Sequence, residues 1–461
     1  MKPEHAVVVG GSIAGLLAAA AAAKHFERVT ILERDELTDG PVVRKGAPQG
    51  NQIHILLPIG EKLIAELLPG IRDEFIAEGF SEYNPAADCA GLSSLGWAPR
   101  VRIAAGNVVG FRRPLLEWIV RRRLLNLGNV DVLHANVTGF TIDERGSNLT
   151  GVTVKNGEPI AADLVIDAAG RGSKAIKWLA ELGFDAPKEA EVRAYVGYAT
   201  QFVRLREGQL APGTLGIGTL PEPTAPVGGV LLPADNGVCS MAAYGMAKNY
   251  PPGDREGLID YLAGAPSPLL SEIFRDSEPA SEIHTYRMPG NLRRFWEDLE
   301  PRPGRFVVTG DAVGSYNPTY GQGLTTAAFG ATYLDEALRA NAASLDPVPS
   351  EFQRALAAKV EVAFDMSARG DVAYEGAEVI NYQPPSEEEQ AYVGRLMELS
   401  ISGDIEVMEA LREANSTMRP ELLDTEELRR KAEGPPPELP PFDVRDYPTH
   451  VYQGRDSVVP G

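Results

Sequence analysis

The chain has 461 residues, which is too long for one compact core, so we expect two domains and a C-terminal extension. With 44% hydrophobic residues, it can bury a sizeable interior. The net charge of -20 argues against nucleic acid or an anionic membrane as partner, because like charges repel. Two cysteines without a CxxC pair, and histidines without ligand spacing, argue against disulfides and metal and favour the cytoplasm.

The start of the chain predicts a strand, a tight turn and a buried helix. Ala6–Val9 is an apolar run, and GGSIAG (Gly10–Gly15) follows it. This turn matches the dinucleotide fingerprint GxGxxG except that Ser12 replaces the second glycine, and a helix N-terminus behind such a turn favours phosphate. The apolar run Leu16–Ala23 is too short for an expected membrane span, and the start MKPEH lacks the pattern expected of a signal peptide.

A second predicted strand, Val29–Leu32, ends at Glu33. A carboxylate about 20 residues beyond such a glycine turn is placed to accept hydrogen bonds from a ribose diol. These features indicate a dinucleotide site but do not distinguish FAD from NAD.

Two later segments repeat the pattern of a buried strand that ends in an acidic, glycine-containing loop. The predicted strand Ala162–Ile166 runs into DAAGRGS (Asp167–Ser173). The predicted strand Arg305–Thr309 runs into GDAVGSYNPTYGQG (Gly310–Gly323), and a helix is expected over Thr325–Ala340. Three distant loops of this kind favour FAD, which is long enough to be held at its pyrophosphate, ribityl chain and ring.

Between these last two loops, residues 190–246 alternate like the strands of a sheet. This alternation, with turn residues between the runs, favours a mixed or antiparallel sheet. Candidate pocket residues are Trp97, Tyr195, Tyr198, Met241 and Tyr244. Each of them, taken singly, is more typical of an ordinary sheet core or surface. His54 is a candidate proton relay, and a purely structural role fits it as well.

The C-terminal region is expected to be helical from Pro349 to about Ala432. The run PPPELPP (Pro435–Pro441) then favours an extended segment. It could cover the active site, pack on a partner subunit or stay disordered, and the sequence does not choose between these roles.

The three loops, with Glu33, resemble the dinucleotide, DG and GD motifs of the class A flavoprotein monooxygenases of the para-hydroxybenzoate hydroxylase fold. RKGAPQGNQIHILL (Arg44–Leu57), FRRPLLEWIVRRR (Phe111–Arg123) and YRMPGNLRRFWE (Tyr286–Glu297) are similar to bacterial polyketide-pathway epoxidases and hydroxylases. The resemblance implies an α/β fold: a Rossmann-like, GR2-type FAD-binding domain (residues 1–80, 105–175 and 300–342), an inserted β-sheet substrate domain (81–104 and 176–299) and a helical C-terminal region with a proline-rich tail (343–461).

The resemblance also implies which residues contact FAD. The expected contacts are Gly10, Gly11, Ser12, Ile13, Ala14, Gly15, Glu33, Arg34, Arg44, Lys45, Arg113, Val137, Asp167, Gly170, Asp311, Pro318, Gly321, Gln322, Gly323 and Leu324. Among them, Asp311 would hold the ribityl chain, and Val137 would pair with adenine through its backbone.

The implied activity is that of a cytoplasmic monooxygenase, an epoxidase or hydroxylase of polyketide-type antibiotic biosynthesis that transfers oxygen from a flavin C4a-hydroperoxide to a hydrophobic small molecule. NAD(P)H, as a transient reductant, or a separate flavin reductase would reduce the flavin, and a homodimer is compatible with the pattern. The DG motif departs from the family because Ala168 replaces its glycine, which weakens the expectation for NADP. An FAD-binding, non-redox cyclase that folds a polyene for [4+2] cycloaddition is therefore the alternative.

Overall fold

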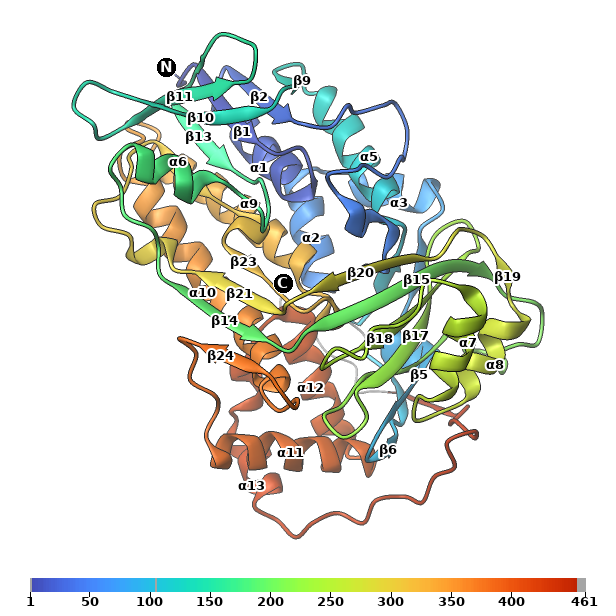
Figure 1. Ribbon diagram of the computed structural model, residues 1–461. Coiled ribbons are helices and arrows are strands. Elements are labelled where there is room, and N and C mark those ends of the chain that lie inside the picture. Colours follow the sequence, from blue (N-terminus) through green and yellow to red (C-terminus); the bar gives the residue numbers. More distant parts are fainter. Residues whose placement is uncertain (1, 104–105, 454–461) are drawn as a thin grey trace.

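The structure is a computed structural model that describes residues 2–103 and 106–453. Its centre is a parallel five-stranded sheet in the order β22-β13-β1-β2-β9 (Figure 1). The strands are β1 (His5–Val9), β2 (Arg28–Glu33), β9 (Val130–His134), β13 (Leu164–Asp167) and β22 (Phe306–Val308). Because all of them are parallel, their carboxyl ends, where the three predicted loops begin, meet at one edge.

Helix α1 (Ile13–Ala23) lies in the core of this layer. Every residue of α1 except Ala14 is buried, as its alanine-rich sequence predicts for a helix that is apolar on all sides. It contacts β1 and β2 together with helices α5 (Arg113–Leu125) and α9 (Gly323–Ala340). The small side chains of α1 allow this close approach, and they hold the turn before the helix in a fixed position.

The strands that follow α5 divide between two sheets. β9 ends at His134, and the chain then enters β10 (Val137–Ile142), which pairs with β11 (Leu149–Val154) and β12 (Ile160–Ala161) in a separate antiparallel sheet. The break lies at Ala135, whose backbone N–H donates to the carbonyl of Glu33 at 2.8 Å. This bond brings the start of β10 next to the acidic end of β2.

A second, eight-stranded sheet, the substrate sheet, lies below the first in Figure 1. Its strands are β5 (Cys89–Ser93), β6 (Gly96–Trp97), β15 (Val196–Arg204), β16 (Gly216–Thr219), β17 (Val227–Pro233), β18 (Cys239–Gly245), β19 (Glu278–Pro279) and β20 (His284–Met288). Helices α7 (Arg255–Ala263) and α8 (Leu269–Asp276) contact β17 and cover one face. The other face is turned toward the carboxyl edge of the parallel sheet.

The C-terminal region is mainly helical, as expected. It contains α10 (Val348–Asp371), α11 (Glu387–Ile401), α12 (Ile405–Thr417) and α13 (Glu426–Ala432). A short strand, β24 (Glu378–Ile380), interrupts the helices and pairs with β14 (Glu189–Arg193) in a four-stranded sheet that also holds β21 (Asn291–Arg294) and β23 (Gly314–Ser315).

The proline-rich run is neither helix nor strand, and the chain after it runs along the substrate sheet. The indole of Trp97 donates to the carbonyl of Asp443 at 2.8 Å. The Tyr447 hydroxyl accepts from the backbone N–H of Ala211 at 2.8 Å. The segment ends in β25 (Val451–Gln453), which pairs with β7 (Arg100–Arg102). This tail therefore covers the outer side of the substrate sheet.

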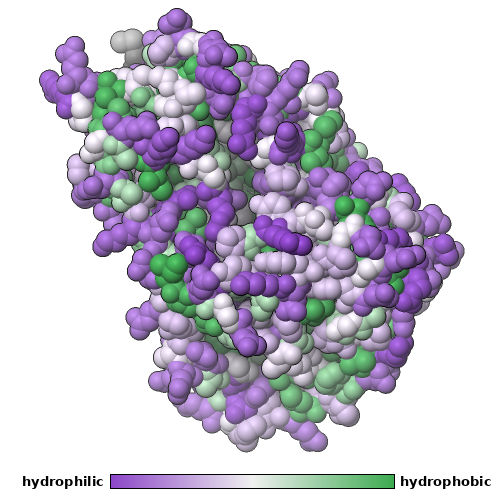
Figure 2. All heavy atoms as spheres, in the orientation of Figure 1, coloured by the Kyte–Doolittle hydropathy of each residue, from purple (hydrophilic) through white to green (hydrophobic). Residues whose placement is uncertain are grey.

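Within the described ranges, no helix has both the length and the apolar character needed to cross a bilayer. Figure 2 shows hydrophilic residues over most of the visible face, with hydrophobic residues in small separate patches. This surface agrees with the large negative charge of the chain.

We predict that Gly15→Ala destabilises the fold by ~1–3 kcal/mol, the range typical of overpacked sites. A Cβ atom at this position would lie 1.9 Å from the backbone oxygen of Gly10, and neither atom belongs to a flexible side chain. Denaturant unfolding measures the effect. The control is Gly394→Ala in α11, where a Cβ atom meets nothing within 4 Å and a gain of ~0.5–1 kcal/mol is expected. Equal stability of wild type and Gly15→Ala would contradict the argument.

Candidate functional site: a cofactor and substrate cavity

One large cavity of about 1540 Å³ lies between the carboxyl edge of the parallel sheet, the inner face of the substrate sheet and the C-terminal helices. It is bordered by segments of all three predicted loops: 12–14, 168–172 and 315–324. Sites for drug-sized ligands are about 300–1,000 Å³. This cavity therefore has room for a long cofactor and a second molecule beside it.

The turn between β1 and α1 is held by its glycines and by Ser12. Gly10 has a φ of 105°, which suits glycine, and its N–H donates to the carbonyl of Leu32 at 2.9 Å. The Ser12 hydroxyl donates to Glu117 at 2.5 Å and accepts from Arg113 at 2.8 Å. The serine that breaks the glycine fingerprint is thus a connection between the turn and helix α5.

Glu117 on α5 is the centre of a buried group of charges that the sequence analysis missed. Its carboxylate pairs with Arg44 at 2.8 Å and with Arg113 at 3.0 Å, and Arg44 also pairs with Glu33 at 2.9 Å. Burial alone would raise the pKa of Glu117, but Arg113 and Arg44 outweigh burial and lower it to about 2. The available signal was the spacing of four residues between Arg113 and Glu117 on one helix.

His54 borders the cavity next to this group of charges. Its Nδ1 lies 2.9 Å from the carbonyl of Gln52, and its Nε2 lies 3.2 Å from Arg113. Because arginine only donates, Nε2 is the acceptor and Nδ1 carries the proton. Burial and the charge of Arg113 lower the pKa of His54 to about 3, so the imidazole is neutral at physiological pH.

The third loop brings Asp311 and the start of α9 to the same cavity. Asp311 follows β22, and burial raises its pKa, while Arg113 and Arg171 offset part of that rise. Gly321 has a φ of 67°, and a Cβ atom at Gly323 would meet only a carboxylate oxygen of Asp311, at 3.9 Å. The N-terminus of α9 is therefore open to a ligand, and its free N–H groups favour negative charge there.

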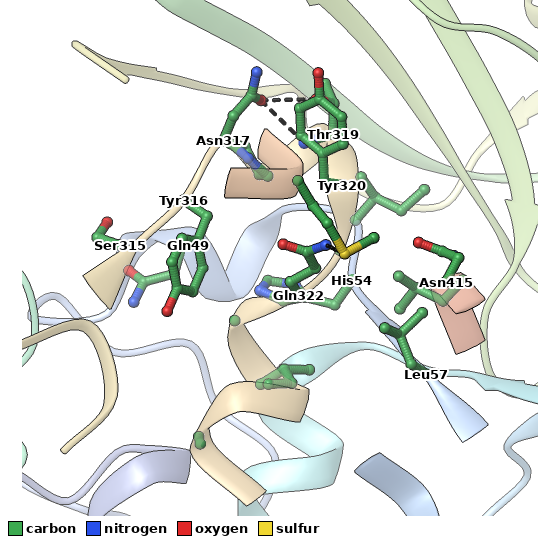
Figure 3. Close-up of a pocket in the computed structure, with 18 of the residues that line it drawn as sticks. Gln49, His54, Leu57, Ser315, Tyr316, Asn317, Thr319, Tyr320, Gln322 and Asn415 are labelled. Atoms are coloured by element: carbon green, nitrogen blue, oxygen red, sulfur yellow. Dashed lines mark hydrogen bonds between the residues drawn. The ribbon is translucent and has the colours of Figure 1, made fainter. Parts of the chain in front are cut away.

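A buried carboxylate outside the cavity fixes this loop. Asp371, at the end of α10, accepts hydrogen bonds from Asn291 at 2.8 Å and from Asn317 at 3.0 Å. Burial raises the pKa of Asp371 to about 7 despite these donors. Asn317 in turn accepts a hydrogen bond from the backbone N–H of Thr319 (Figure 3), so α10 fixes this loop through Asp371. No sequence pattern pointed to Asp371.

The second loop borders the cavity through its backbone and not through its acid. The carboxylate of Asp167 accepts from the backbone N–H of Ala169 and from the Ser173 hydroxyl, and so shapes its own turn. Arg171 borders the cavity and donates to the carbonyl of Gly290 at 2.8 Å.

Most residues expected to bind the cofactor border the cavity. They are Gly10, Ser12, Ile13, Ala14, Glu33, Arg34, Arg44, Arg113, Val137, Gly170, Asp311, Pro318, Gly321, Gln322, Gly323 and Leu324. Four others lie elsewhere: Gly11 and Gly15 are in the turn behind the cavity wall, Asp167 is directed into its own loop, and Lys45 lies on a smaller neighbouring hollow.

The expected substrate residues divide according to the alternation of the strands. Tyr198 and Tyr244 border the cavity, with ring centroids 6.0 Å apart. Met241 points to the opposite face, under α7 and α8, and Trp97 packs in that same core. Tyr195 lies at the surface, where its ring receives Lys248 at 4.2 Å. Tyr286, whose ring is 5.6 Å from Tyr198, completes the aromatic face and was not among the predicted pocket residues.

This arrangement fits FAD. Two helix N-termini, of α1 and α9, face one cavity, and both are suited to the negative charge of a pyrophosphate or a reduced ring. Glu33 and Asp311 stand between them and can accept hydrogen bonds from ribose and ribityl hydroxyls. The aromatic face of the substrate sheet lies across the remaining space.

The comparisons with known proteins agree. The family model described as FAD dependent oxidoreductase matches residues 6–238. Protein Rv3254 of Mycobacterium tuberculosis (strain ATCC 25618 / H37Rv) is 32% identical over 400 residues, which cover 81% of each chain.

Two solved structures show a similar fold. The flavin-dependent brominase Bmp2 is 17% identical with a TM-score of 0.62, over 93% of both chains. PqsL of P. aeruginosa in complex with 2-aminobenzoylacetate is 16% identical with a TM-score of 0.62, over 81% of this chain and 97% of that one. The predicted α/β fold is confirmed.

We predict that Glu117→Gln lowers the free energy of unfolding by ~3–5 kcal/mol, because buried Arg113 loses its carboxylate partner and Arg44 keeps only its pairs with Glu33 and Asp35. Denaturant unfolding of the FAD-loaded protein at neutral pH measures this loss. The matched control is Glu66→Gln, which removes an exposed pair with Lys62 and should change stability by less than ~1 kcal/mol.

Wild type and Glu117→Gln also test how the contribution of Glu117 to stability depends on pH. The pKa of Glu117 is lower in the folded than in the unfolded chain, so its contribution is complete above about 4.5 and is lost as pH falls toward about 2. The stability difference between wild type and Glu117→Gln should therefore shrink below pH ~4.5. A difference that stays constant over this range would contradict the assignment.

Proposed function

The chain belongs to the FAD-dependent oxidoreductase family, so FAD is its cofactor, and we propose that it is a monooxygenase that inserts one atom of O2 into a hydrophobic small molecule. The observation that carries this proposal is the single cavity that joins the three cofactor loops to the aromatic face of the substrate sheet. Bound FAD supplies the electrons and the activation of O2 that such a reaction needs.

The residues of the chain would hold and orient the cofactor. The turn Gly10–Gly15 and the start of α1 would receive the pyrophosphate, with Arg44 and Arg113 beside it. Asp311 would accept hydrogen bonds from the ribityl chain. The backbone at Gly321–Leu324 would lie along the ring, where the N-terminus of α9 stabilises negative charge.

The other walls would exclude water and position the substrate. Tyr198, Tyr244 and Tyr286 offer flat apolar rings whose hydroxyls can donate hydrogen bonds. Burial raises the pKa of Tyr198 and of Tyr244, so both stay protonated. Neutral donors beside a flat surface suit an electron-rich ring or alkene, which supports a polyketide-type substrate and either hydroxylation or epoxidation.

We propose NAD(P)H as the source of electrons, used directly or through a separate flavin reductase. The FAD-loaded protein is mixed with NAD(P)H, with and without a reductase, and with candidate polycyclic phenols and polyenes under isotopically labelled O2. Substrate-dependent oxygen uptake with label in the product supports the proposal. Conversion of a polyene without O2, while the flavin stays oxidised, identifies the non-redox cyclase instead.

We predict that Asp311→Asn weakens FAD binding ~10-fold to 100-fold, because an amide is a poorer acceptor for hydroxyl donors than a carboxylate. Titration of the apoprotein with FAD, followed by flavin fluorescence, measures the change. The control is Asp346→Asn, at an exposed carboxylate paired with Arg305, which should bind FAD like wild type. Equal affinity of Asp311→Asn and wild type would remove Asp311 from the site.

A further inference from the structure

The inner side of helix α12 carries two polar side chains that face the cavity, Arg412 and Asn415. They are three residues apart and therefore lie on the same side of the helix. Figure 3 shows Asn415 beside Leu57, with His54 and Gln322 across the pocket. The C-terminal helices thus contribute polar groups to the same space that the third loop borders.

Arg412 differs from the other arginines of this cavity. Arg44 and Arg113 share the carboxylate of Glu117, and Arg369 pairs with Asp365. Among the described residues, Arg412 has neither an ion pair nor a hydrogen bond through its guanidinium, and its side chain is exposed to the cavity. Its five N–H groups are therefore available to a ligand.

No described residue forms an ion pair with Arg412. Burial lowers the pKa of Arg412, although its side chain stays accessible from the cavity. The thiol of Cys89 on β5 lies near Arg412, and burial raises the pKa of that thiol to about 12, so it carries no charge. A guanidinium that faces a cavity without a partner among the described residues is free to pair with a bound anion.

The walls near Arg412 suit a flat apolar body. On β5, Gly91 has no side chain, and nothing lies within 4 Å of the position of its missing Cβ. Leu232 on β17 and Met397 on α11 also border the cavity, and Met397 keeps 47% of its surface exposed. A molecule with one acidic group and a planar hydrocarbon portion would satisfy both parts of this region.

We propose that Arg412 binds the carboxylate of a largely apolar substrate, with Asn415 as a second hydrogen-bond donor. This inference rests on the proposed function, since it assigns the substrate class of the same cavity. A guanidinium can hold a carboxylate by two parallel hydrogen bonds, which fixes orientation as well as position. The acid would be anchored at α12, and the apolar portion would extend toward the third loop and the tyrosines.

The test compares an acid with its neutral isostere on the FAD-loaded protein. Calorimetric titration with 2-naphthoate and 2-naphthamide should show at least ~10-fold tighter binding of the acid to wild type. Arg412→Gln should abolish this preference and leave the amide affinity within about threefold. Arg412→Lys should keep part of the preference, because it keeps the charge but not the planar fork. The matched control, Arg430→Gln on exposed α13, should behave like wild type.

The outcomes separate this inference from the proposed function. If wild type binds the acid no tighter than the amide, or Arg412→Gln weakens both ligands equally, the assignment of Arg412 is overturned. FAD content per chain is measured in each variant, and a loss in Arg412→Gln would also overturn it, because the residue would then serve the cofactor. Binding needs no turnover, so a protein that selects the acid but transfers no oxygen would refute only the monooxygenase activity.

Discussion

The whole cofactor side depends on one buried carboxylate between two guanidinium groups. Glu117 lies on α5, and its partners Arg44 and Arg113 would repel each other without it. Through Ser12 the same carboxylate reaches the turn before α1, and through Arg44 it reaches Glu33 at the end of β2. Removing these charges from water is costly, so the arrangement is worth having only if it does more than stabilise. It holds two cations at the place where the pyrophosphate is expected.

The substrate side is organised by the alternation of strand residues. Each strand of the substrate sheet turns one set of side chains to α7 and α8 and the other to the cavity. Tyr244 and Met241, three residues apart on β18, consequently lie on opposite faces. One face of the sheet is therefore a packed core, and the other is a surface of the cavity on which a flat molecule can lie.

Much of this could be predicted from the sequence where the signal is local. Two short patterns carried this signal: the strand, glycine turn and helix at Ala6–Ala23, and the acidic loop that begins at Gly310. Each needs particular residue types at fixed positions, and the family and fold that they indicated are confirmed. The partners of these loops could not be predicted, because Asp371 and Asn317 are 54 positions apart in the sequence and come together only in the folded chain. Trp97 and Met241 were expected in the pocket but lie in the core on the opposite face, because the sequence does not reveal which face of the sheet helices cover.

Arg412 could not be identified from the sequence either. In the sequence it is one of many charges on an acidic, helical segment, and only the packing of α12 against the cavity distinguishes it.

The position of α12 in the chain has a consequence for assembly in the cell. Domains form in the order in which the ribosome delivers them. The loops expected to grip FAD are complete once α9 has emerged, whereas the wall that carries Arg412 follows about one-sixth of the polypeptide later. During translation FAD can therefore bind while the cavity still lacks its C-terminal wall, and the part of the cavity for the second molecule is completed only afterwards.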